Sequence, residues 1–355
     1  MDVNGKKKVF VALSGGVDSS VAALLLRDRG YDVTGVFMSC YNLDGCAERD
    51  AADARRVASH LGIPFYSWDF KDEYKKRVVE YMVEGYRKGE TPNPDVVCNK
   101  EIKFGLFLEK ALAIGADYVA TGHYVRKVID DSGIGNRLFT ARDTNKDQSY
   151  FLWTLKQKQL ERCLFPIGDY LKPEVREMAR KAGLPTAEKK DSQGICFLGK
   201  VTLAEFLKEY IPSRRGEVFD AFGRKIGEHD GAEFYTIGER HVGVAVSKPV
   251  YVAEKDVKAN TLVMAEADDD SLYRKEIRLT NLNFISPNFN GGEVLARVRY
   301  RQPLAKAMLW QTQNSKYQIP KYKLEFDEPI KFVAAGQSAV FYSGENELLG
   351  GGVIL

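Results

Sequence analysis

A glycine pair between an apolar run and an amphipathic run constrains the fold of this chain more than any other feature. Val9–Leu13 has the length of a strand, and Ser19–Arg29 has the apolar periodicity of a helix. The turn between them reads Ser-Gly-Gly-Val-Asp-Ser at residues 14–19. Backbone N–H groups at such a turn, followed by a helix N-terminus, form an anion site. The turn therefore predicts a phosphate-binding loop, with a plain strand-to-helix turn as the alternative.

This loop differs from the two commonest nucleotide-binding motifs. The spacing G-x-G-x-x-G cannot be laid on it, which argues against a dinucleotide fingerprint. The lysine that reaches the β- and γ-phosphates in a P-loop does not follow it. Such a loop is better suited to hold pyrophosphate as a leaving group, with attack at the α-phosphate. Asp18 is then a candidate to bind magnesium or to lie beside the pyrophosphate.

Alternating apolar and amphipathic runs over the first 125 residues predict parallel α/β units. We expect strands at 9–13, 33–38, 63–68 and 117–120, and helices at 19–29, 47–61, 72–87 and 99–114. We further expect a hairpin over 124–141 and helices at 148–155 and 173–181.

Beyond these units the pattern changes to short strands, and then to a nearly continuous alternation of residues between the two faces of strands. In the last block Leu295, Arg297, Arg299 and Arg301 are expected on one face of a strand. We therefore predict an α/β class with three domains: a parallel-sheet catalytic domain at 1–201, a small mixed domain at 202–271, and a β-barrel at 272–355.

Charge is nearly balanced over the whole chain but not locally. The net charge is +3, whereas residues 291–323 hold seven Lys or Arg and one acidic residue. This stretch predicts a phosphate-binding surface on the barrel, with a solvated face as the alternative.

The remaining composition excludes several classes of protein. Hydrophobic residues make up 44% and charged residues 28% of 355 residues, as in globular proteins. No apolar run approaches a membrane span and no signal peptide is visible, so a cytoplasmic location is expected. The five cysteines include no Cys-x-x-Cys pair, which argues against a disulfide scaffold or a four-cysteine metal site.

Residues 14–19 resemble the signature of the PP-loop ATP pyrophosphatases. This superfamily includes GMP, NAD, asparagine and argininosuccinate synthetases as well as tRNA-modifying enzymes. Its members activate a substrate oxygen by adenylation, so the resemblance implies ATP with Mg²⁺, but the loop alone leaves these reactions open.

The cysteines offer a way to choose among these reactions. After adenylation a nucleophile must attack, and a cysteine persulfide can carry sulfur while a second cysteine releases it by exchange. Cys98 lies in a polar stretch that we expect at the N-terminal edge of a helix, where the dipole favours thiolate. Cys196 lies in a glycine-containing polar segment. Cys163 is interpreted as a small buried apolar residue, and Cys40 and Cys46 stay open.

Five motifs occur in order along the chain: TPNPDxxCNxxIKFG, ATGHY, KDQSYFL, SxGICF and GQSAVFY. Together they resemble the bacterial tRNA-specific 2-thiouridylase family from Ser14 to the terminal LGGGVIL. The chain departs from that family after Met38, where Ser39–Asn42 replaces a longer insert and leaves Cys40 without an inherited role.

The resemblance implies a role for several groups of residues. Cys98 would be the nucleophile, Cys196 the persulfide carrier and its transient disulfide partner, and Asp95 an acid or base. The residues implied in ATP binding are Ala12, Leu13, Ser14, Gly15, Gly16, Val17, Asp18, Ser19, Met38 and Gly122. Asn93, Pro94 and Asp95 would contact the target base. The residues implied in tRNA contact are His123, Lys146, Asp147, Gln148, Arg299, Tyr300 and Gln337.

The family activity is ATP-dependent thiolation of the wobble uridine at C2. The implied partners are tRNAs with lysine, glutamate or glutamine anticodons and an upstream persulfide donor protein. No association with a membrane is expected. The sequence does not give the oligomeric state, although a monomer is expected. Two other functions stay open: a nitrogen-transferring PP-loop synthetase, and a tRNA-binding protein with an inactive nucleotide site.

Overall fold

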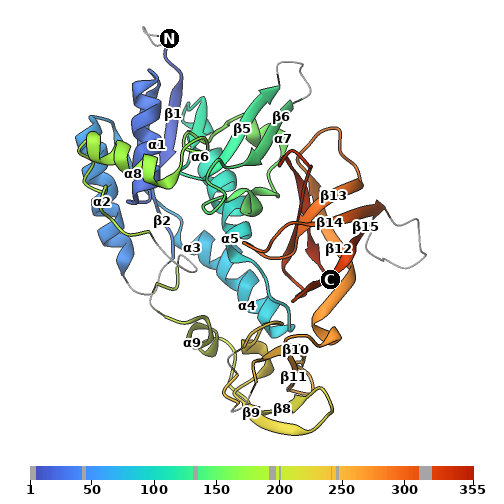
Figure 1. Cartoon of the computed structure of the whole chain (residues 1–355). Helices are drawn as coiled ribbons and strands as arrows, with labels where there is room; N and C mark the ends of the chain where they lie inside the picture. Colours follow the sequence, from blue (N-terminus) through green and yellow to red (C-terminus); the bar gives the residue numbers. More distant parts are fainter. Residues whose placement is uncertain are drawn as a thin grey trace.

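The computed structural model describes residues 5–41, 45–130, 135–191, 197–199, 201–240, 242–244, 248–311 and 322–355. In these residues the first half of the chain forms a five-stranded parallel sheet of order β3-β2-β1-β4-β7. Figure 1 labels two of its strands, β1 and β2. The strands of this sheet are β1 (Lys8–Ala12), β2 (Asp32–Ser39), β3 (Phe65–Asp69), β4 (Tyr118–Ala120) and β7 (Cys163–Leu164).

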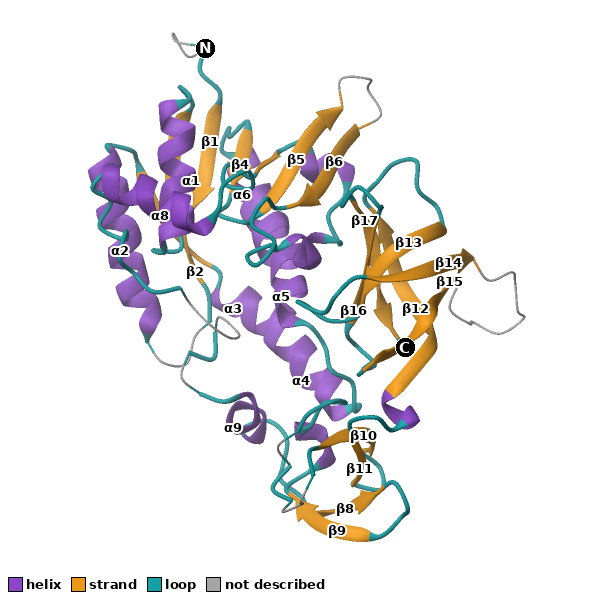
Figure 2. Ribbon diagram, in the orientation of Figure 1, coloured by secondary structure: helices purple, strands orange, loops and turns teal. Residues whose placement is uncertain are grey.

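Both faces of this sheet are buried, as expected for a parallel sheet. Val9 and Val11 pack with three helices on one face: α1 (Val17–Asp28), α2 (Cys46–Leu61) and α8 (Lys172–Lys181). Phe10 and Ala12 belong to the core on the other face, which they share with two longer helices. These helices run through the middle of the view in Figure 2. The alternation within β1 therefore fixes which helices cover which side.

The two longer helices contain stretches of π-helix. The helix expected at 72–87 consists of α3 (Lys71–Tyr74), η1 (Lys75–Val79) and α4 (Glu80–Arg87). The helix expected at 99–114 consists of α5 (Pro94–Val97), η2 (Cys98–Leu106) and α6 (Phe107–Ala113). It begins at Pro94, earlier than predicted, because Asn93 caps it and proline occupies its first turn.

One expected helix is wrong. Residues 148–155 form only a 3-10 turn, η3 (Ser149–Leu152), because the rings of Tyr150 and Trp153 are held by hydrogen bonds to Ser338 instead of continuing a helix. The hairpin is confirmed as β5 (Val125–Asp130) and β6 (Gly135–Thr140). The short helix α7 (Gln157–Leu160) was not expected.

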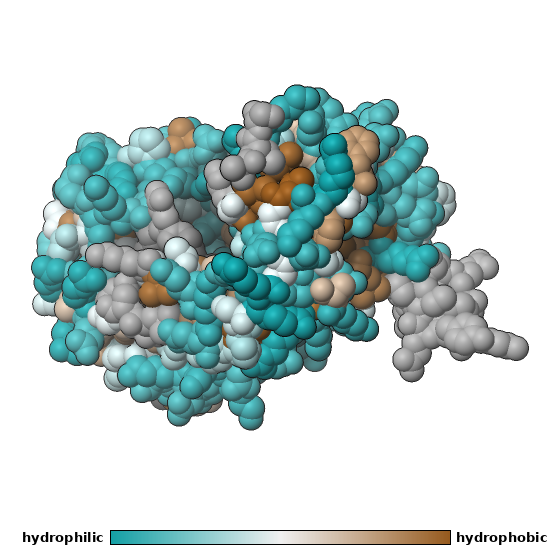
Figure 3. Space-filling model, turned by 90° about the horizontal axis from the view of Figure 1, so that it is seen from below, coloured by the Kyte–Doolittle hydropathy of each residue, from teal (hydrophilic) through white to brown (hydrophobic). Residues whose placement is uncertain are grey.

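The next part is a four-stranded sheet of order β10-β11-β8-β9, preceded by the helix α9 (Leu203–Lys208). Its strands are β8 (Gly216–Asp220), β9 (Lys225–His229), β10 (Val250–Asp256) and β11 (Thr261–Glu266). It has a small core of its own around Val218 and Leu262. Seen from below, the surface is mainly hydrophilic with a few hydrophobic patches (Figure 3).

The C-terminal strands close into a barrel of order β12-β15-β14-β13-β16-β17, as predicted. They are β12 (Tyr273–Phe284), β13 (Gly292–Arg297), β14 (Ala305–Gln311), β15 (Tyr322–Lys331), β16 (Ser338–Tyr342) and β17 (Leu348–Ile354). The arginine row expected along one strand is wrong beyond Arg297, where β13 ends. Arg299 turns away to donate to the carbonyl of Ile237, and Arg301 has a left-handed backbone with φ of 65°.

The barrel packs directly on the first part of the chain through Trp153. The indole N–H donates to Ser338 Oγ at 3.0 Å, and the Trp153 carbonyl accepts from Asn283 Nδ2 at 2.7 Å. A Cβ atom on Gly351 would lie 2.7 Å from the indole ring. The absence of a side chain at Gly351 therefore lets the ring approach this strand closely. The predicted domain boundaries at 201/202 and 271/272 stay predictions.

Candidate active site

The glycine-containing loop lies at the point where the strand order of the parallel sheet reverses. The chain runs from β1 outward to β2 and β3, and then returns to place β4 on the other side of β1. α/β sheets place ligands at such a switch point, outside the carboxyl ends of the strands. Gly122 follows β4, and a Cβ atom there would lie 2.6 Å from the backbone nitrogen of Ser19. The N-terminus of α1 and the end of β4 therefore border the same crevice.

Hydrogen bonds within the loop fix its shape. Ser14 N–H donates to Ser19 Oγ at 3.2 Å, and Ser20 Oγ donates to the Gly16 carbonyl at 2.8 Å. Gly15 has φ of 75°, and a Cβ atom on it would lie 2.4 Å from the Asp50 carbonyl oxygen. Among the described residues no side chain caps α1, so its first N–H groups stay available for an anion.

A lysine from a distant helix reaches this loop, although the loop contains none. Lys172 begins α8, and its Nζ lies 2.7 and 2.8 Å from the two carboxylate oxygens of Asp18. Tyr124 donates its hydroxyl to the same carboxylate at 2.8 Å. Lys172 is only 7% exposed. Lys172 could not be predicted from local sequence, because 154 positions separate it from Asp18.

Asp191 joins Lys172 to two further cations. Its Oδ1 lies 2.9 Å from Lys172 Nζ and 2.7 Å from Arg176, and its Oδ2 lies 2.7 Å from Lys146. Burial raises the pKa of Asp191, but the hydrogen bonds from Lys146 and Lys172 outweigh it and lower the pKa to about 2. The carboxylate therefore stays ionised. Lys146, which was expected to contact tRNA, forms an ion pair with Asp191 in this structure.

Cys98 lies deeper in its helix than expected. Counted from Pro94 it is the fifth helical residue, so the expected position at the N-terminal edge is wrong. The dipole acts mainly within the first turn of a helix, which Asn93 caps through a bond from Val96 N–H at 3.2 Å. Cys98 is 5% exposed and belongs to the core that Phe10 and Ala12 also enter.

Asp95 lies one turn before Cys98 and is partly buried. Burial raises its pKa above the ordinary value, while the charge of Lys103 partly offsets this. A carboxyl group of this kind can exchange a proton nearer to neutral pH than an exposed aspartate. Among the sequence-predicted base contacts, Asn93 is partly exposed and Pro94 is buried.

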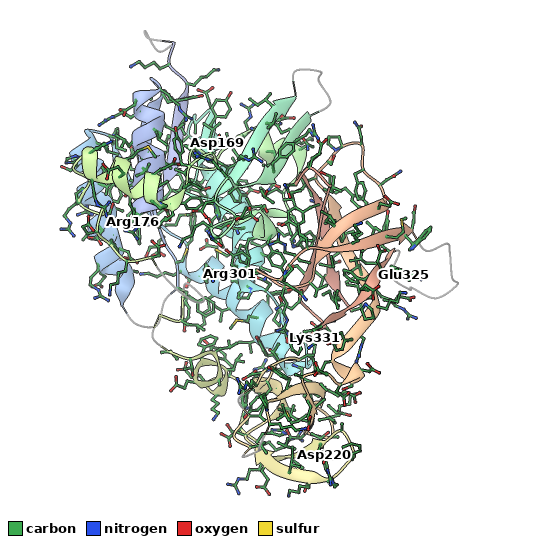
Figure 4. The ribbon with its side chains drawn as sticks, viewed as in Figure 1. Asp169, Arg176, Asp220, Arg301, Glu325 and Lys331 are labelled. Atoms are coloured by element: carbon green, nitrogen blue, oxygen red, sulfur yellow. The ribbon has the colours of Figure 1, made fainter. Side chains whose placement is uncertain are left out.

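The barrel brings its predicted residues to the same helix. Gln337 donates from Nε2 to the Thr91 carbonyl at 2.8 Å, next to the cap of α5. The Tyr300 ring lies 4.4 Å from the Phe151 ring, whose backbone carbonyl accepts from Asn99 at 3.3 Å. Figure 4 labels Arg301, which is exposed and follows Tyr300. Arg299 is partly buried, and burial lowers its pKa.

Three further predicted tRNA residues point into the protein. His123 is 6% exposed with Nδ1 2.7 Å from Thr121 Oγ1, and burial holds its pKa well below 6.5. Asp147 accepts from Ala141 N–H at 3.0 Å, and burial raises its pKa. Gln148 accepts from Tyr124 N–H at 3.0 Å. These residues shape the region beside the crevice, and their contact with tRNA stays a prediction.

The other predicted residues are only partly placed. Met38 lies one residue before the end of β2, opposite Trp68, and packs against the core that contains Cys98. Cys196 lies outside the described residues, as does the side chain of Cys46. The next residue, Phe197, is 1% exposed and belongs to the same core as Cys98. Cys163 is fully buried, and burial raises its pKa to about 12, as expected for a core cysteine.

Two absences apply to the described part of the chain only. There, no cluster of three or more His, Cys, Asp or Glu side chains is arranged to hold a metal ion. Also within those residues, no helix combines the length and apolar character needed to cross a membrane.

A parallel sheet with a phosphate-type loop at its switch point, joined to a barrel, defines a nucleotide-binding α/β enzyme of the PP-loop class. Family models match the chain as a tRNA methyl transferase HUP domain at 7–200, a tRNA methyl transferase PRC-barrel domain at 204–266 and an aminomethyltransferase beta-barrel domain at 274–354. The chain belongs to the tRNA-specific 2-thiouridylase family, because it matches named members over its full length.

Two of these relatives come from streptococci. The tRNA-specific 2-thiouridylase MnmA of Streptococcus thermophilus (strain CNRZ 1066) is 45% identical over 368 residues, which cover 100% of this chain and 96% of that protein. The protein of the same name from Streptococcus mutans serotype c (strain ATCC 700610 / UA159) is 45% identical with the same coverage.

Solved structures resemble the chain only weakly. A 4-thiouridine synthetase–RNA complex with bound ATP is 19% identical, covering 58% of this chain and 50% of that chain at a TM-score of 0.34. An NMN synthetase from Francisella tularensis is 16% identical, covering 53% and 67% at a TM-score of 0.32. At these TM-scores neither fold nor function follows from the likeness.

Proposed function

We propose that this chain is a tRNA 2-thiouridylase, which uses ATP to replace the C2 oxygen of the wobble uridine at position 34 by sulfur. The observation that carries the proposal is the 45% identity to 2-thiouridylases over the entire chain, and not over the nucleotide loop alone. The geometry supports it, because the loop at the switch point and the helix with Cys98 both border the parallel sheet.

In the first half-reaction the uridine O2 attacks the α-phosphorus of ATP. A bond forms between O2 and phosphorus, the bond from phosphorus to the bridging oxygen breaks, and pyrophosphate leaves. The N3 proton of the uridine passes to a base, for which Asp95 is the candidate, and returns to N3 when the product is released. The loop of residues 12–19 would hold the phosphates by backbone N–H groups, with Lys172 as the cation that a P-loop carries within its own motif. Magnesium bound with ATP would neutralise phosphate charge, and Asp18 offers the nearest carboxylate on the loop.

In the second half-reaction sulfur replaces the adenylated oxygen. The terminal sulfur of a Cys196 persulfide attacks C2, and AMP leaves with the former O2. The Cys98 thiolate then attacks the Cys196 sulfur, which forms the Cys98–Cys196 disulfide and releases 2-thiouridine. External thiols must reduce this disulfide before the next turnover. In the alternative order Cys98 first releases hydrosulfide from the persulfide, and hydrosulfide attacks C2.

Other residues are assigned to substrate binding in this proposal. Asn93, Pro94 and Asp95 contact the flipped base, with Asp95 as acid or base. Met38 and Gly122 line the adenine side. The tRNA, of lysine, glutamate or glutamine type, crosses from the barrel residues Arg299, Tyr300 and Gln337 toward His123 and residues 146–148, and a separate cytoplasmic donor protein supplies the persulfide to a monomeric enzyme.

Thiolation of unmodified tRNA with Mg–ATP and a persulfide donor, detected by retardation in a mercury gel, tests this function. We expect retarded tRNA with the wild type and none with Cys98→Ser or Cys196→Ser. Cys163→Ala is the matched control, because Cys163 is a buried core residue and its loss should leave product formation within about twofold of wild type.

The same assay separates the two other functions. A nitrogen-transferring synthetase would turn over ATP and keep its activity in both serine variants. A tRNA-binding protein with an inactive nucleotide site would bind tRNA without producing AMP. Either result with active tRNA and donor would refute the proposed thiolation.

A further inference from the structure

The segment 186–191, which we call the strap, lies along the nucleotide loop and is tied to it at its first residue. Thr186 donates its hydroxyl to Ser20 Oγ at 2.9 Å, and both side chains are buried. Ser20 in turn donates to the Gly16 carbonyl of the loop at 2.8 Å. The strap therefore begins on the helix that presents the phosphate-binding groups.

Two cations hold the middle of the strap. Arg176 of α8, labelled in Figure 4, donates to the backbone carbonyls of Ala187 and Lys189 at 3.0 Å each. Lys189 Nζ lies 2.6 Å from a carboxylate oxygen of Asp50 and 2.6 Å from one of Asp53, both in α2. The Asp50 backbone carbonyl is the group that approaches Gly15 closely.

The strap ends at Asp191, whose carboxylate shares a cation with the nucleotide loop. The Lys172 ammonium bridges the two oxygens of Asp18 and one oxygen of Asp191 within 2.9 Å. An ammonium has three donors, and three carboxylate oxygens already surround this one. A phosphate that binds Lys172 therefore competes with the two carboxylates for its donors.

We propose that Asp191 is a positioning residue that couples nucleotide binding at the loop to the strap through the ammonium it shares with Asp18. The inference rests on the proposed function in one respect, that the loop binds ATP. Asp18 keeps the Tyr124 hydroxyl as a second partner, and Asp191 keeps Lys146 and Arg176. Because Asp191 has two other cations, it can release Lys172 at lower electrostatic cost than Asp18 can.

Release of Lys172 changes the end of the strap and not its beginning. The contact of Thr186 with Ser20 does not involve the shared cation, whereas Asp191 loses one of its three cationic partners. Cys196 follows five positions later in the sequence. Triphosphate binding thus loosens the strap next to the segment that carries the proposed persulfide, before sulfur is needed.

Two measurements on the intact chain test this coupling: amide hydrogen exchange of the peptide that spans the strap, and the rate at which Cys196 is alkylated, read by peptide mass spectrometry. With a non-hydrolysable ATP analogue and magnesium, we expect both rates in the wild type to rise by about fivefold or more, the lower end of typical coupling. AMP lacks the β- and γ-phosphates and should leave both rates unchanged.

Asp191→Asn removes the charge while keeping the shape of the side chain. In this variant both rates should already be raised without nucleotide, and the analogue should add less than about twofold. Glu188→Gln is the matched control, because Glu188 is an acidic strap residue whose ion-pair partner is Arg180 and not Lys172. It should respond like the wild type.

The coupling is refuted if the analogue binds the wild type by calorimetry but changes neither rate, or if Asp191→Asn responds by the same factor as the wild type. The wild-type comparison of AMP with the analogue decides the question even if Asp191→Asn does not fold. Failure of the analogue to bind at all would instead count against the proposed function, so the two failures are distinct.

Discussion

At the scale of single residues, Lys172 supplies to the loop the charge that its own motif omits. Its backbone is fixed as well, since Lys172 N–H donates to Asp143 Oδ2 at 2.9 Å. The side chain is buried and held between two carboxylates, so it is oriented before any phosphate arrives. A cation held in this way loses little conformational freedom on binding a ligand.

Lys172→Met should weaken binding of an ATP analogue at least about tenfold. A hydrogen bond to a charged group contributes roughly 1.5–3 kcal/mol, and loss of the ammonium also leaves Asp18 and Asp191 to repel phosphate. Isothermal calorimetry measures the change. Lys181→Met on the same helix is the control, because Lys181 is exposed and its partner Glu177 is 3.6 Å away; equal affinities in both variants would contradict the assignment.

His123 makes stability depend on pH. Burial, with a smaller contribution from Lys103, holds its folded-state pKa well below 6.5, whereas the unfolded imidazole titrates near 6.5. Below that pH the unfolded state binds the proton and the folded state does not, so the free energy of unfolding decreases as the pH is lowered. Between pH 7.5 and 5.5 the wild type should therefore lose more free energy of unfolding than His123→Gln does. Urea unfolding at both pH values measures this, and equal losses would be inconsistent with a neutral buried histidine.

At the scale of elements, local patterns predicted the units around the nucleotide loop but not their long-range adjustments. The apolar runs around β1, β2 and α1 are found within a few residues of their expected positions, because burial on both sides of a parallel sheet is visible in sequence. The loss of a helix after Gln148 and the end of β13 at Arg297 depend on partners far along the chain, Ser338 and Ile237. The same limit hid Lys172 from the predicted site.

Gly351→Ala tests the contact between β17 and the 3-10 turn. The new Cβ would lie 2.7 Å from two ring atoms of Trp153 and 3.0 Å from the Ala339 carbonyl, so the ring must move. Overpacking of this kind costs about 1–3 kcal/mol. Urea unfolding followed by tryptophan fluorescence measures the loss. Gly344→Ala is the control, because no atom lies within 4 Å of its added Cβ; similar destabilisation in both variants would argue against the contact.

At the scale of the whole molecule, the parallel sheet and the barrel share one of their apolar cores, although the barrel also encloses a core of its own around Leu279 and Leu309. Tyr150 and Trp153 belong to the shared core together with Ile285, Val340 and Tyr342 of the C-terminal part. The sheet of β8–β11 instead has a separate, smaller core. Burial of a common core makes elements unfold together, whereas separate cores allow separate opening.

Native-state hydrogen exchange should therefore show two different free energies of opening in the molecule. Protected amides of β16 and of β1 should exchange with about the same free energy of opening, because Val340 and Phe10 are buried in the same core. Amides of β10 and β11 should open at a lower free energy. A free energy of opening for β16 well below that of β1 would contradict the shared core. Equal free energies of opening for β1, β16 and the β10–β11 pair would contradict a separate core in the sheet of β8–β11.

Thr91 lies just before the cap of the Cys98 helix. Its backbone N–H and carbonyl both form hydrogen bonds with residues near the C-terminus. Its N–H donates to the Ala335 carbonyl at 2.7 Å, and its carbonyl accepts from Gln337 at 2.8 Å. These two backbone groups can therefore find their partners only after nearly the whole polypeptide has been synthesised. A chain that ends before Ala335 would lack both contacts at the start of the Cys98 helix.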